Sequence, residues 1–398
     1  MEPPNSYNAN ITDLKGKKIV VSALDLEQSE HRGIAVYSKA LIKSLNEAGA
    51  EVWLLTQYDS WKRSGNLRNL PIETQKIIDS AKVLDPLAYG EQRTVPKIIP
   101  NKFKLRSSFT TLVNGIEYLK EFIRKPRKYK KRQLRKIKIK KLFDNPYLRI
   151  ERLGYLKNVE GLLCAKNIFL ATELAALNSP QKPVIIDLDG FDALLTTCPL
   201  NIKPINTNNF IQTIHDLIPL EYDQHGDDMA IFSHRLQACL KAKRLYVSNS
   251  TAIKFKDHIS NHNREKNEKK VDIEKILIQP PSLKFPEWIK GELESYSDLK
   301  PVTYLMRSDH KNRLLPFRYL LFNSSVEARK NLLFLVKAYS ESNLGSRGFK
   351  LCVTGKLKND SYSNKVREIV KHEPGIMLTG YIDESTKLDL YLNAFALL

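Results

Sequence analysis

Hydrophobic and polar positions near the start of the chain follow the pattern of a strand, an amphipathic helix and a second strand. Residues 19–23 form a mostly apolar run, which is typical of a strand buried on both faces of a sheet. Apolar side chains then recur at helical spacing from residue 34 to 48, and Gly49 provides a helix end. Residues 52–55 are apolar again. This order predicts a βαβ unit with parallel strands.

The same alternation returns twice along the chain. Further strands are predicted at 184–188, 210–214 and 244–247, and a second series runs from residue 319 as strands 319–322, 349–354 and 376–379 with helices 328–342, 363–372 and 384–395. Prolines and charges without periodicity fill 282–316. We therefore predict an α/β protein with two parallel-sheet domains, residues 1–283 and 319–398, joined by a linker at 284–318.

Composition changes this picture little. Of 398 residues 42% are hydrophobic, as in globular proteins. The four cysteines make no pair at metal-ligand or redox spacing, and the N-terminus lacks the order of a signal peptide. No apolar run reaches the ~18 residues of a membrane span. The predicted location is the cytoplasm, either free or on the inner face of the membrane.

Charge is concentrated in one segment. From Lys120 to Lys141 there are 13 lysines and arginines against one acid, which gives +12 of the total +20. Apolar spacing there allows a helix with a narrow apolar stripe, inside a basic helical insertion at about 100–160. Three interpretations stand: a surface for anionic lipids, a nucleic-acid surface, or a solvated helix. Because aromatic residues are not interleaved as base stacking requires, we predict no nucleic-acid partner.

Two adjacent cations mark a candidate anion site. In the segment 323–332, Arg329 and Lys330 stand where a buried strand turns into a helix. A helix start offers unpaired N–H groups and the positive end of the macrodipole, and full charges added there suit a diphosphate. The alternative is two exposed first-turn residues, but cations at that end oppose the helix dipole, which favours a functional role.

A histidine and a glycine mark a second candidate site. His215 directly follows the strand 210–214, at the carboxyl edge where open α/β sheets bind ligands. Gly33 opens the first helix, where the absence of a Cβ lets a ligand approach the backbone. The alternatives are a histidine that merely ends a strand and an ordinary turn glycine.

These motifs, with those at 246–251 and 378–391, resemble the family-four retaining glycosyltransferases of the GT-B fold, in their mannosyltransferase-like branch. The resemblance implies two Rossmann-like domains facing a cleft, a nucleotide-sugar donor such as GDP-mannose, and a polysaccharide or lipid-linked acceptor. It implies that His215 contacts the donor sugar, that Gly33 approaches the diphosphate, and that Arg329 and Lys330 hold it. Neither a metal nor another cofactor is expected.

Two departures from that family stand out. Ser324 takes a position where many members have an arginine, and the chain stops where members continue into a strand and a loop with two glutamates. We therefore expect the second domain to be incomplete, with an open edge at its last apolar run, 395–398. The alternatives to an active transferase are a fragment of a longer enzyme and a non-catalytic, transferase-like binding protein.

Acidic groups leave one further alternative. Asp187 and Asp189 follow a predicted strand in the Asp-x-Asp order with which GT-A transferases hold Mn²⁺. Such pairs are frequent at strand ends, and a GT-A enzyme has no use for the later Arg-Lys pair. We interpret a second group, His225, Asp227, Asp228 and His234, as surface residues rather than a metal site. Residues 58–182 carry no family motif.

Overall fold

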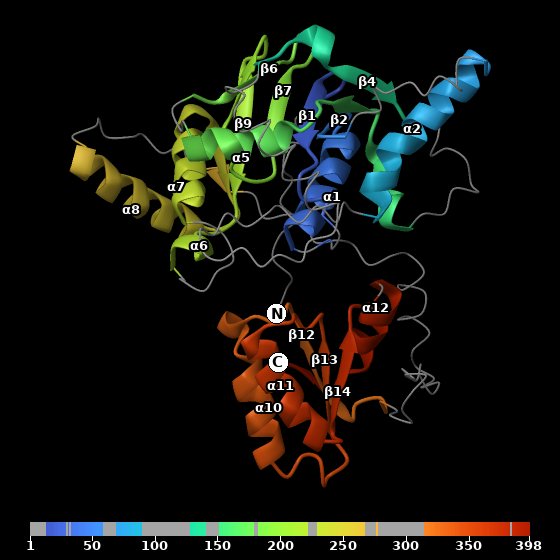
Figure 1. Cartoon of the computed structure of the whole chain (residues 1–398), viewed down its shortest axis with the longest axis vertical. Coiled ribbons are helices and arrows are strands. Elements are labelled where there is room, and N and C mark those ends of the chain that lie inside the picture. The colour runs from blue at the N-terminus through green and yellow to red at the C-terminus, as the bar shows by residue number, and fades with distance from the viewer. Residues whose placement is uncertain are drawn as a thin grey trace, which may run out of the picture. The chain divides into compact units, whose positions relative to one another are not determined.

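The computed structural model (Figure 1) shows two compact units, residues 1–283 and 284–398, and each is described here by itself. It describes residues 13–28, 31, 33–58, 69–89, 128–140, 151–178, 182–221, 229–266, 276–277, 314–382 and 384–398. Both units are α/β with parallel sheets, so the predicted class of two Rossmann-like units is confirmed. Within these residues no helix has the length and apolar character needed to cross a membrane.

The N-terminal unit is built on an eight-stranded sheet in which every pairing is parallel except that of β4 with β5. Its strands in spatial order are β11 (Ile276–Leu277), β10 (Lys243–Tyr246), β9 (Asn209–Ile214), β7 (Ala193–Thr196), β1 (Lys18–Ser22), β2 (Glu51–Thr56), β5 (Gly161–Cys164) and β4 (Arg135–Lys138). Because the parallel strands share a direction, their carboxyl ends meet at one edge of the sheet.

Helices cover both faces of this sheet, and the pleat of β1 decides which core each side chain enters. Val21 packs with α1 (Gly33–Glu47) and α2 (Ile72–Tyr89), whereas Val20 packs on the other face with α5 (Ile168–Asn178). Both valines are fully buried, as expected of a strand between two helical layers. Beyond β9 lie α6 (Ile218–Glu221), α7 (Met229–Ala238) and α8 (Asn249–Lys266).

A small parallel sheet of β3 (Lys128–Tyr129), β6 (Val184–Asp187) and β8 (Ile202–Ile205) adjoins the large one. It corrects the helix expected in the basic segment, since residues 128–140 form β3, a 3-10 turn at Lys131–Gln133 and β4. Ile137 and Ile139 are buried while the lysines between and beside them are exposed, which is the period of a strand. The turn at Glu151–Asn158 is also 3-10. Residues 120–127 and 141 lie outside the described residues.

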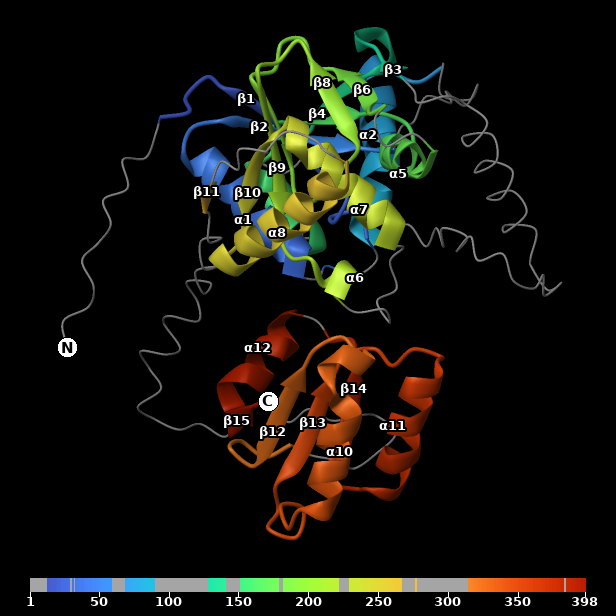
Figure 2. The same ribbon diagram turned by 90° about the vertical axis from the view of Figure 1, so that its left-hand side faces the viewer.

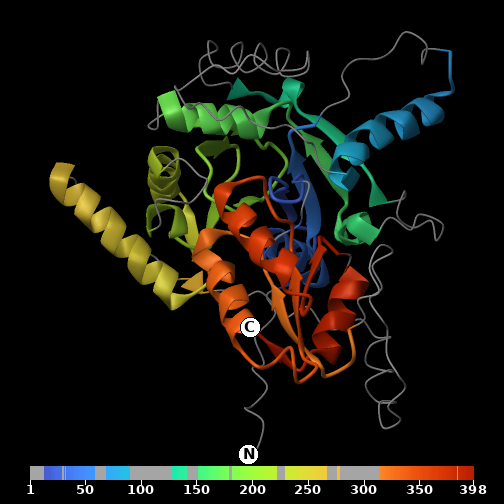
Figure 3. The ribbon, with the colours of Figure 1, turned by 60° about the horizontal axis from the view of Figure 1, so that its bottom comes forward.

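The C-terminal unit carries a four-stranded parallel sheet (Figure 2). Its strands in spatial order are β14 (Ile376–Gly380), β13 (Lys350–Thr354), β12 (Tyr319–Asn323) and β15 (Ala396–Leu397). Helices α10 (Leu332–Glu341) and α11 (Ser361–His372) lie side by side on one face, as Figure 3 also shows, and α12 (Glu384–Asn393) packs on the other through Leu390.

Two expectations for this unit need correction. The last apolar run forms a strand that completes a four-stranded sheet, because β15 pairs with β12 and the Leu398 N–H donates to the Leu321 carbonyl at 2.9 Å. Among the described residues β15 is the last strand of the sheet, so the open edge lies on β15 itself. The helix expected from residue 328 begins only at Leu332, because Asn331 has a positive φ of 53° that interrupts the helical path after the 3-10 turn Ala328–Lys330.

Candidate functional site

His215 lies at the carboxyl edge of the N-terminal unit, one residue beyond β9, and is half-buried. Its Nε2 is 2.9 Å from the carbonyl oxygen of Thr197. A carbonyl can only accept a hydrogen bond, so Nε2 carries the proton. In the neutral ring Nδ1 is then the free acceptor, which is the state suited to receive a hydrogen bond from a ligand hydroxyl.

Thr197, one residue beyond β7, connects three strand ends. Its N–H donates to Ser22 Oγ at 3.0 Å, and its hydroxyl donates to Asp25 Oδ2 at 2.6 Å. Ser22 Oγ lies 3.1 Å from the same hydroxyl, and both Ser22 and Thr197 are fully buried. The ends of β1, β7 and β9 are therefore joined by one polar network that fixes His215 and Asp25 together.

Burial sets the charge state of this network. Loss of water raises the pKa of Asp25, although the Thr197 hydrogen bond and the nearby His215 oppose that rise. Burial also lowers the pKa of His215, and the Thr197 carbonyl and Asp25 offset only part of the effect. The imidazole is therefore neutral at pH 7. The ring of Tyr37 on α1 meets it edge to face at 4.8 Å between centroids and restricts its plane.

Hydrogen bonds from residues at the starts of α8 and α6 fix the loop that carries His215. The Thr251 hydroxyl donates to the His215 carbonyl at 2.8 Å, and Ser248 Oγ accepts the Thr251 N–H at 3.1 Å at the start of α8. Asp216 accepts the Ile218 N–H at 3.1 Å, so this exposed carboxylate ends the loop and begins α6. The motif at 246–251 thus supports the backbone of His215.

Gly33 is the first residue of α1 and is exposed. A Cβ built there meets nothing within 4 Å, so the packing of the unit does not require glycine at this position. Tyr37, which contacts His215, lies one helical turn further along the same face. The structure therefore brings Gly33 and His215 to the same edge and leaves open space at the helix start.

Arg329 and Lys330 lie in the 3-10 turn before α10 and are exposed. Arg329 Nε donates to Glu327 Oε2 at 2.9 Å, and Lys358 Nζ is 3.8 Å from the other oxygen of Glu327. The two cations therefore precede the helix instead of forming its first turn. One helix-start amide is already used, because the Leu333 N–H donates to the hydroxyl of Tyr362 on α11 at 2.9 Å.

The carboxyl edge of the C-terminal sheet supplies residues that the sequence analysis missed. Gly355 has a φ of 117°, and a Cβ there would stand 2.3 Å from the Ser324 carbonyl oxygen, so the loops after β12 and β13 are in close contact. Thr354 donates to Asn323 Oδ1 at 2.6 Å across the same two strands. Two exposed cations, Lys356 and Lys358, follow Gly355. Of the nearby cations, Arg329 and Lys358 contact Glu327.

The Asp-x-Asp pair lies elsewhere. Asp189 pairs with Lys131, and Asp187 Oδ1 accepts a hydrogen bond from Asn206 Nδ2 at 2.8 Å. Both lie close to Asp192, whose N–H bonds to the carbonyl of Lys18, the first residue of β1. The pair therefore sits at the amino edge of the large sheet, opposite His215.

The second acidic group cannot be assembled from the described residues. Of its members only His234 is described, and His234 Nδ1 donates to the Ala176 carbonyl at 2.7 Å. The other three lie outside the described residues. Within the part of the chain that is described, no group of three or more histidine, cysteine, aspartate or glutamate side chains is placed to hold a metal ion.

Asp25 had no visible signal beyond an acid shortly after a strand, because its partner Thr197 lies 172 residues further on. Gly355 had the signal of a glycine directly after a strand, followed by two nearby lysines. Such a pattern is common, and only the approach of Ser324 makes it specific.

Comparisons with known proteins give distant similarity. No protein-family model matches the chain, and no curated protein matches it. Among solved structures it is similar to a TarM mutant from S. aureus in complex with fondaparinux, alpha-GlcNAc-glycerol and UDP, at 11% identity and a TM-score of 0.39 over 94% of this chain and 79% of that one.

Two further structures are similar at the same level. The alpha,alpha-trehalose 6-phosphate synthase of Burkholderia multivorans has 13% identity and a TM-score of 0.37, over 94% of this chain and 75% of that one. The UDP-N-acetylglucosamine 2-epimerase of Rickettsia bellii has 9% identity and a TM-score of 0.35, over 96% and 73%. Because these similarities are so distant, we assign the fold class from the strand order of each unit.

Proposed function

We propose that the chain is a GT-B-type glycosyltransferase that moves a sugar from a nucleoside-diphosphate sugar to a glycan or lipid-linked acceptor. The observation that carries the proposal is His215, held as a neutral imidazole with a free Nδ1 at the carboxyl edge of a parallel sheet. The cations around Glu327 at the carboxyl edge of the other sheet supply the second element that such a reaction needs.

His215 serves as the acceptor for a hydroxyl of the donor sugar. A neutral ring is required, because an imidazolium would present only donors. Thr197 holds Nε2–H and Tyr37 restricts the ring, so Nδ1 faces its ligand without a cost of reorientation when the sugar binds. Gly33 leaves room for the diphosphate at the start of α1.

Arg329, Lys330 and Lys358 stabilise the leaving diphosphate. As the bond between the anomeric carbon and the diphosphate oxygen breaks, the electron pair leaves with the diphosphate. The acceptor oxygen bonds to the carbon and gives its proton to an oxygen of the departing diphosphate. Positive groups aimed at the developing charge lower that barrier most when they are already oriented. Glu327 orients Arg329 in this way, through its hydrogen bond to Nε.

The finer identity of the reaction rests on the sequence resemblance alone. The mannosyltransferase-like motifs favour GDP-mannose as donor, retention of anomeric configuration, and an acceptor in surface polysaccharide or glycolipid assembly. His215, Gly33, Arg329 and Lys330 keep the roles that the resemblance gives them.

The test compares Lys330→Ala with Lys337→Ala in the full chain, using GDP-mannose and UDP-sugars as donors. Both lysines are exposed and both belong to the segment around α10, but only Lys330 stands at the carboxyl edge. We expect Lys330→Ala to lower turnover on the order of 10²-fold with an unchanged melting temperature, and Lys337→Ala to leave turnover unchanged. Equal turnover in both variants removes Lys330 from the site, and donor binding with no turnover in the unmodified chain supports a binding protein.

A further inference from the structure

One flank of the N-terminal unit carries a row of exposed cations. We call it the cationic face, and it consists of Lys128, Lys130, Lys131, Arg132, Lys136, Lys138 and Lys140. Most of these residues lie on β3, on the following 3-10 turn and on β4. Lys130 lies between β3 and the turn, and Lys140 lies just after β4. Because Ile137 on β4 and Ile139 just after it are buried, 7% and 0% exposed, the lysines that alternate with them point away from that core. Among these lysines, Lys136 places its Nζ 4.4 Å from the centroid of the Phe191 ring.

The cations of this face outnumber the acids that contact them. Among the described residues, Lys131 pairs with Asp189, and Lys138 and Lys140 share Glu160 at 3.9 and 3.6 Å. Seven cations with two acids leave an excess of five positive charges. The pKa of Lys136 is lowered, first by burial and then by the positive charges of Lys131 and Lys18. Neighbouring lysines therefore repel one another on this face.

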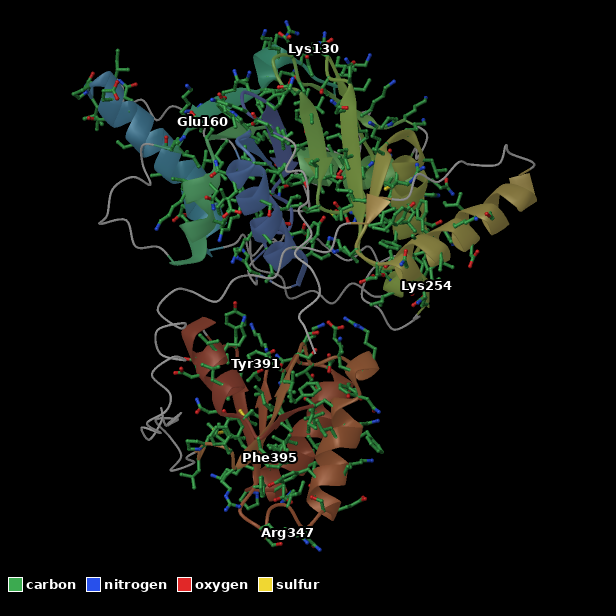
Figure 4. All side chains as sticks on the ribbon, turned by 180° about the vertical axis from the view of Figure 1, so that it is seen from behind. Lys130, Glu160, Lys254, Arg347, Tyr391 and Phe395 are labelled. Carbon is green, nitrogen blue, oxygen red and sulfur yellow. The ribbon has the colours of Figure 1, made fainter. Side chains whose placement is uncertain are left out.

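The cationic face lies beside β4, the last strand at one side of the large sheet, whereas β9, which precedes His215, is the third strand from the other side. β4 runs antiparallel to β5, so Lys138 stands opposite Gly161, the first residue of β5. Lys131 reaches Asp189 beside the amino end of β1. Figure 4 shows Lys130 and Glu160 toward one end of the unit and Lys254, which follows the carboxyl end of β10, toward the other.

We propose that the cationic face docks the protein on an anionic lipid bilayer. Six of its seven cations are lysines, whose compact charges suit diffuse attraction to headgroups better than the bidentate contacts that arginine makes to nucleic acid. The aromatic residue of the segment, Tyr129, is buried with its hydroxyl on the Lys166 carbonyl at 2.8 Å, so it offers no surface on which bases stack.

The placement has a consequence for binding. Four strands, β7, β1, β2 and β5, separate β4 from β9, so a bilayer that contacts β4 lies away from His215. Docking and ligand binding at His215 are therefore independent, and this holds whether or not the proposed transferase activity is correct.

The experiment measures partition of the full chain onto vesicles. We expect binding to equal parts of phosphatidylcholine and phosphatidylglycerol, none to phosphatidylcholine alone, and release as salt approaches 1 M, where the Debye length is about 3 Å. The variant Lys128→Ala/Lys130→Ala/Arg132→Ala removes three exposed cations that form no ion pair with another described residue. It should weaken partition on the order of 100-fold, since each cation near an anionic surface contributes roughly fivefold.

Two controls separate the face from total charge and from folding. Lys337→Ala/Lys365→Ala/Lys371→Ala removes the same charge from exposed helix positions of the C-terminal unit and should leave partition unchanged. Lys128→Arg/Lys130→Arg keeps the charge and should retain binding. Equal loss in both triple-alanine variants, equal binding to neutral vesicles, or preference for duplex DNA over anionic vesicles at matched salt would overturn the proposal. Vesicle binding that persists in His215→Ala supports the separation of the two edges.

Discussion

Thr197 holds His215 through its carbonyl and Asp25 through its hydroxyl, so one residue relates the imidazole to a carboxylate. The two groups respond to burial in opposite directions on the pKa scale, as the loss of water disfavours the charged form of each. The charge of Asp25 nevertheless supports the protonated form of His215. The pH range in which the ring stays neutral is therefore set in part by Asp25.

Asp25→Asn should extend activity to lower pH. Removing the negative charge lowers the pKa of His215 further below its ordinary value of 6.5, so the ring stays neutral and able to accept a hydrogen bond in more acidic solution. The acidic limb of kcat/KM against pH should shift downward, and NMR titration of the imidazole should shift with it. Asp257→Asn, an exposed change on α8, should leave both curves in place.

Stability distinguishes this effect from damage to the fold. The folded-state pKa of Asp25 is raised, so its contribution to stability is fully present below the ordinary value of 3.8 and is lost as pH rises through the folded pKa. An asparagine, which still accepts from Thr197, avoids that loss. Asp25→Asn should therefore be no less stable than the unmodified chain at pH 7, and an upward shift or a fixed position of the acidic limb contradicts the assignment.

At the scale of elements, a glycine holds two strand ends together in the C-terminal unit. Gly355→Ala forces a Cβ within 2.3 Å of the Ser324 carbonyl oxygen at a φ of 117°, which side chains rarely adopt. We expect a loss of roughly 3 kcal/mol or more in unfolding free energy, from backbone strain plus displacement of the β12 loop.

Gly348→Ala is the matched control for that change. Gly348 also has a positive φ, of 78°, but a Cβ there meets nothing within 4 Å. Only strain remains, and we expect a loss of about 1 kcal/mol. Denaturant unfolding of both variants measures the difference. Equal losses would show that contact between the β12 and β13 loops adds nothing to the strain.

Elements also show what a sequence alone can predict. The unit β1, α1 and β2 was predictable because its apolar period is long and ends at Gly49, and β12 and β13 were predictable for the same reason. Residues 128–140 were not, because Ile137 and Ile139 fit either period and the partner strand β5 decides between them. The start of α10 depends on the positive φ of Asn331, which apolar spacing does not reveal.

The residues of the candidate sites also divide into those that the sequence reveals and those that it does not. His215 was found because a strand directly precedes it, and Arg329 and Lys330 were found because they are adjacent. Asp25, Gly355 and Glu327 were missed because their contacts to Thr197, Ser324 and Lys358 come from loops distant in sequence. Local patterns therefore locate the edge of a sheet, and tertiary contacts decide which side chains are fixed there.

At the scale of the whole molecule, the Asp-x-Asp pair and His215 lie at opposite edges of the large sheet. Asp187 and Asp189 lie at the amino edge of the large sheet, and β9, which ends beside His215, is six residues long. Six residues of strand span about 20 Å. A metal on this pair would therefore stand too far from a ligand at His215 to contact its diphosphate.

Chelation should therefore leave transfer unchanged. We expect EDTA to have no effect on donor turnover and Asp187→Asn to keep it within a few-fold, because Asp187 accepts a hydrogen bond from Asn206 and Asp189 pairs with Lys131. His215→Asn in the same assay should lower turnover far more, because it removes the group at the opposite edge. Loss of turnover on chelation with rescue by Mn²⁺, together with failure of Asp187→Asn, would place the chemistry at the amino edge and contradict the assignment of His215.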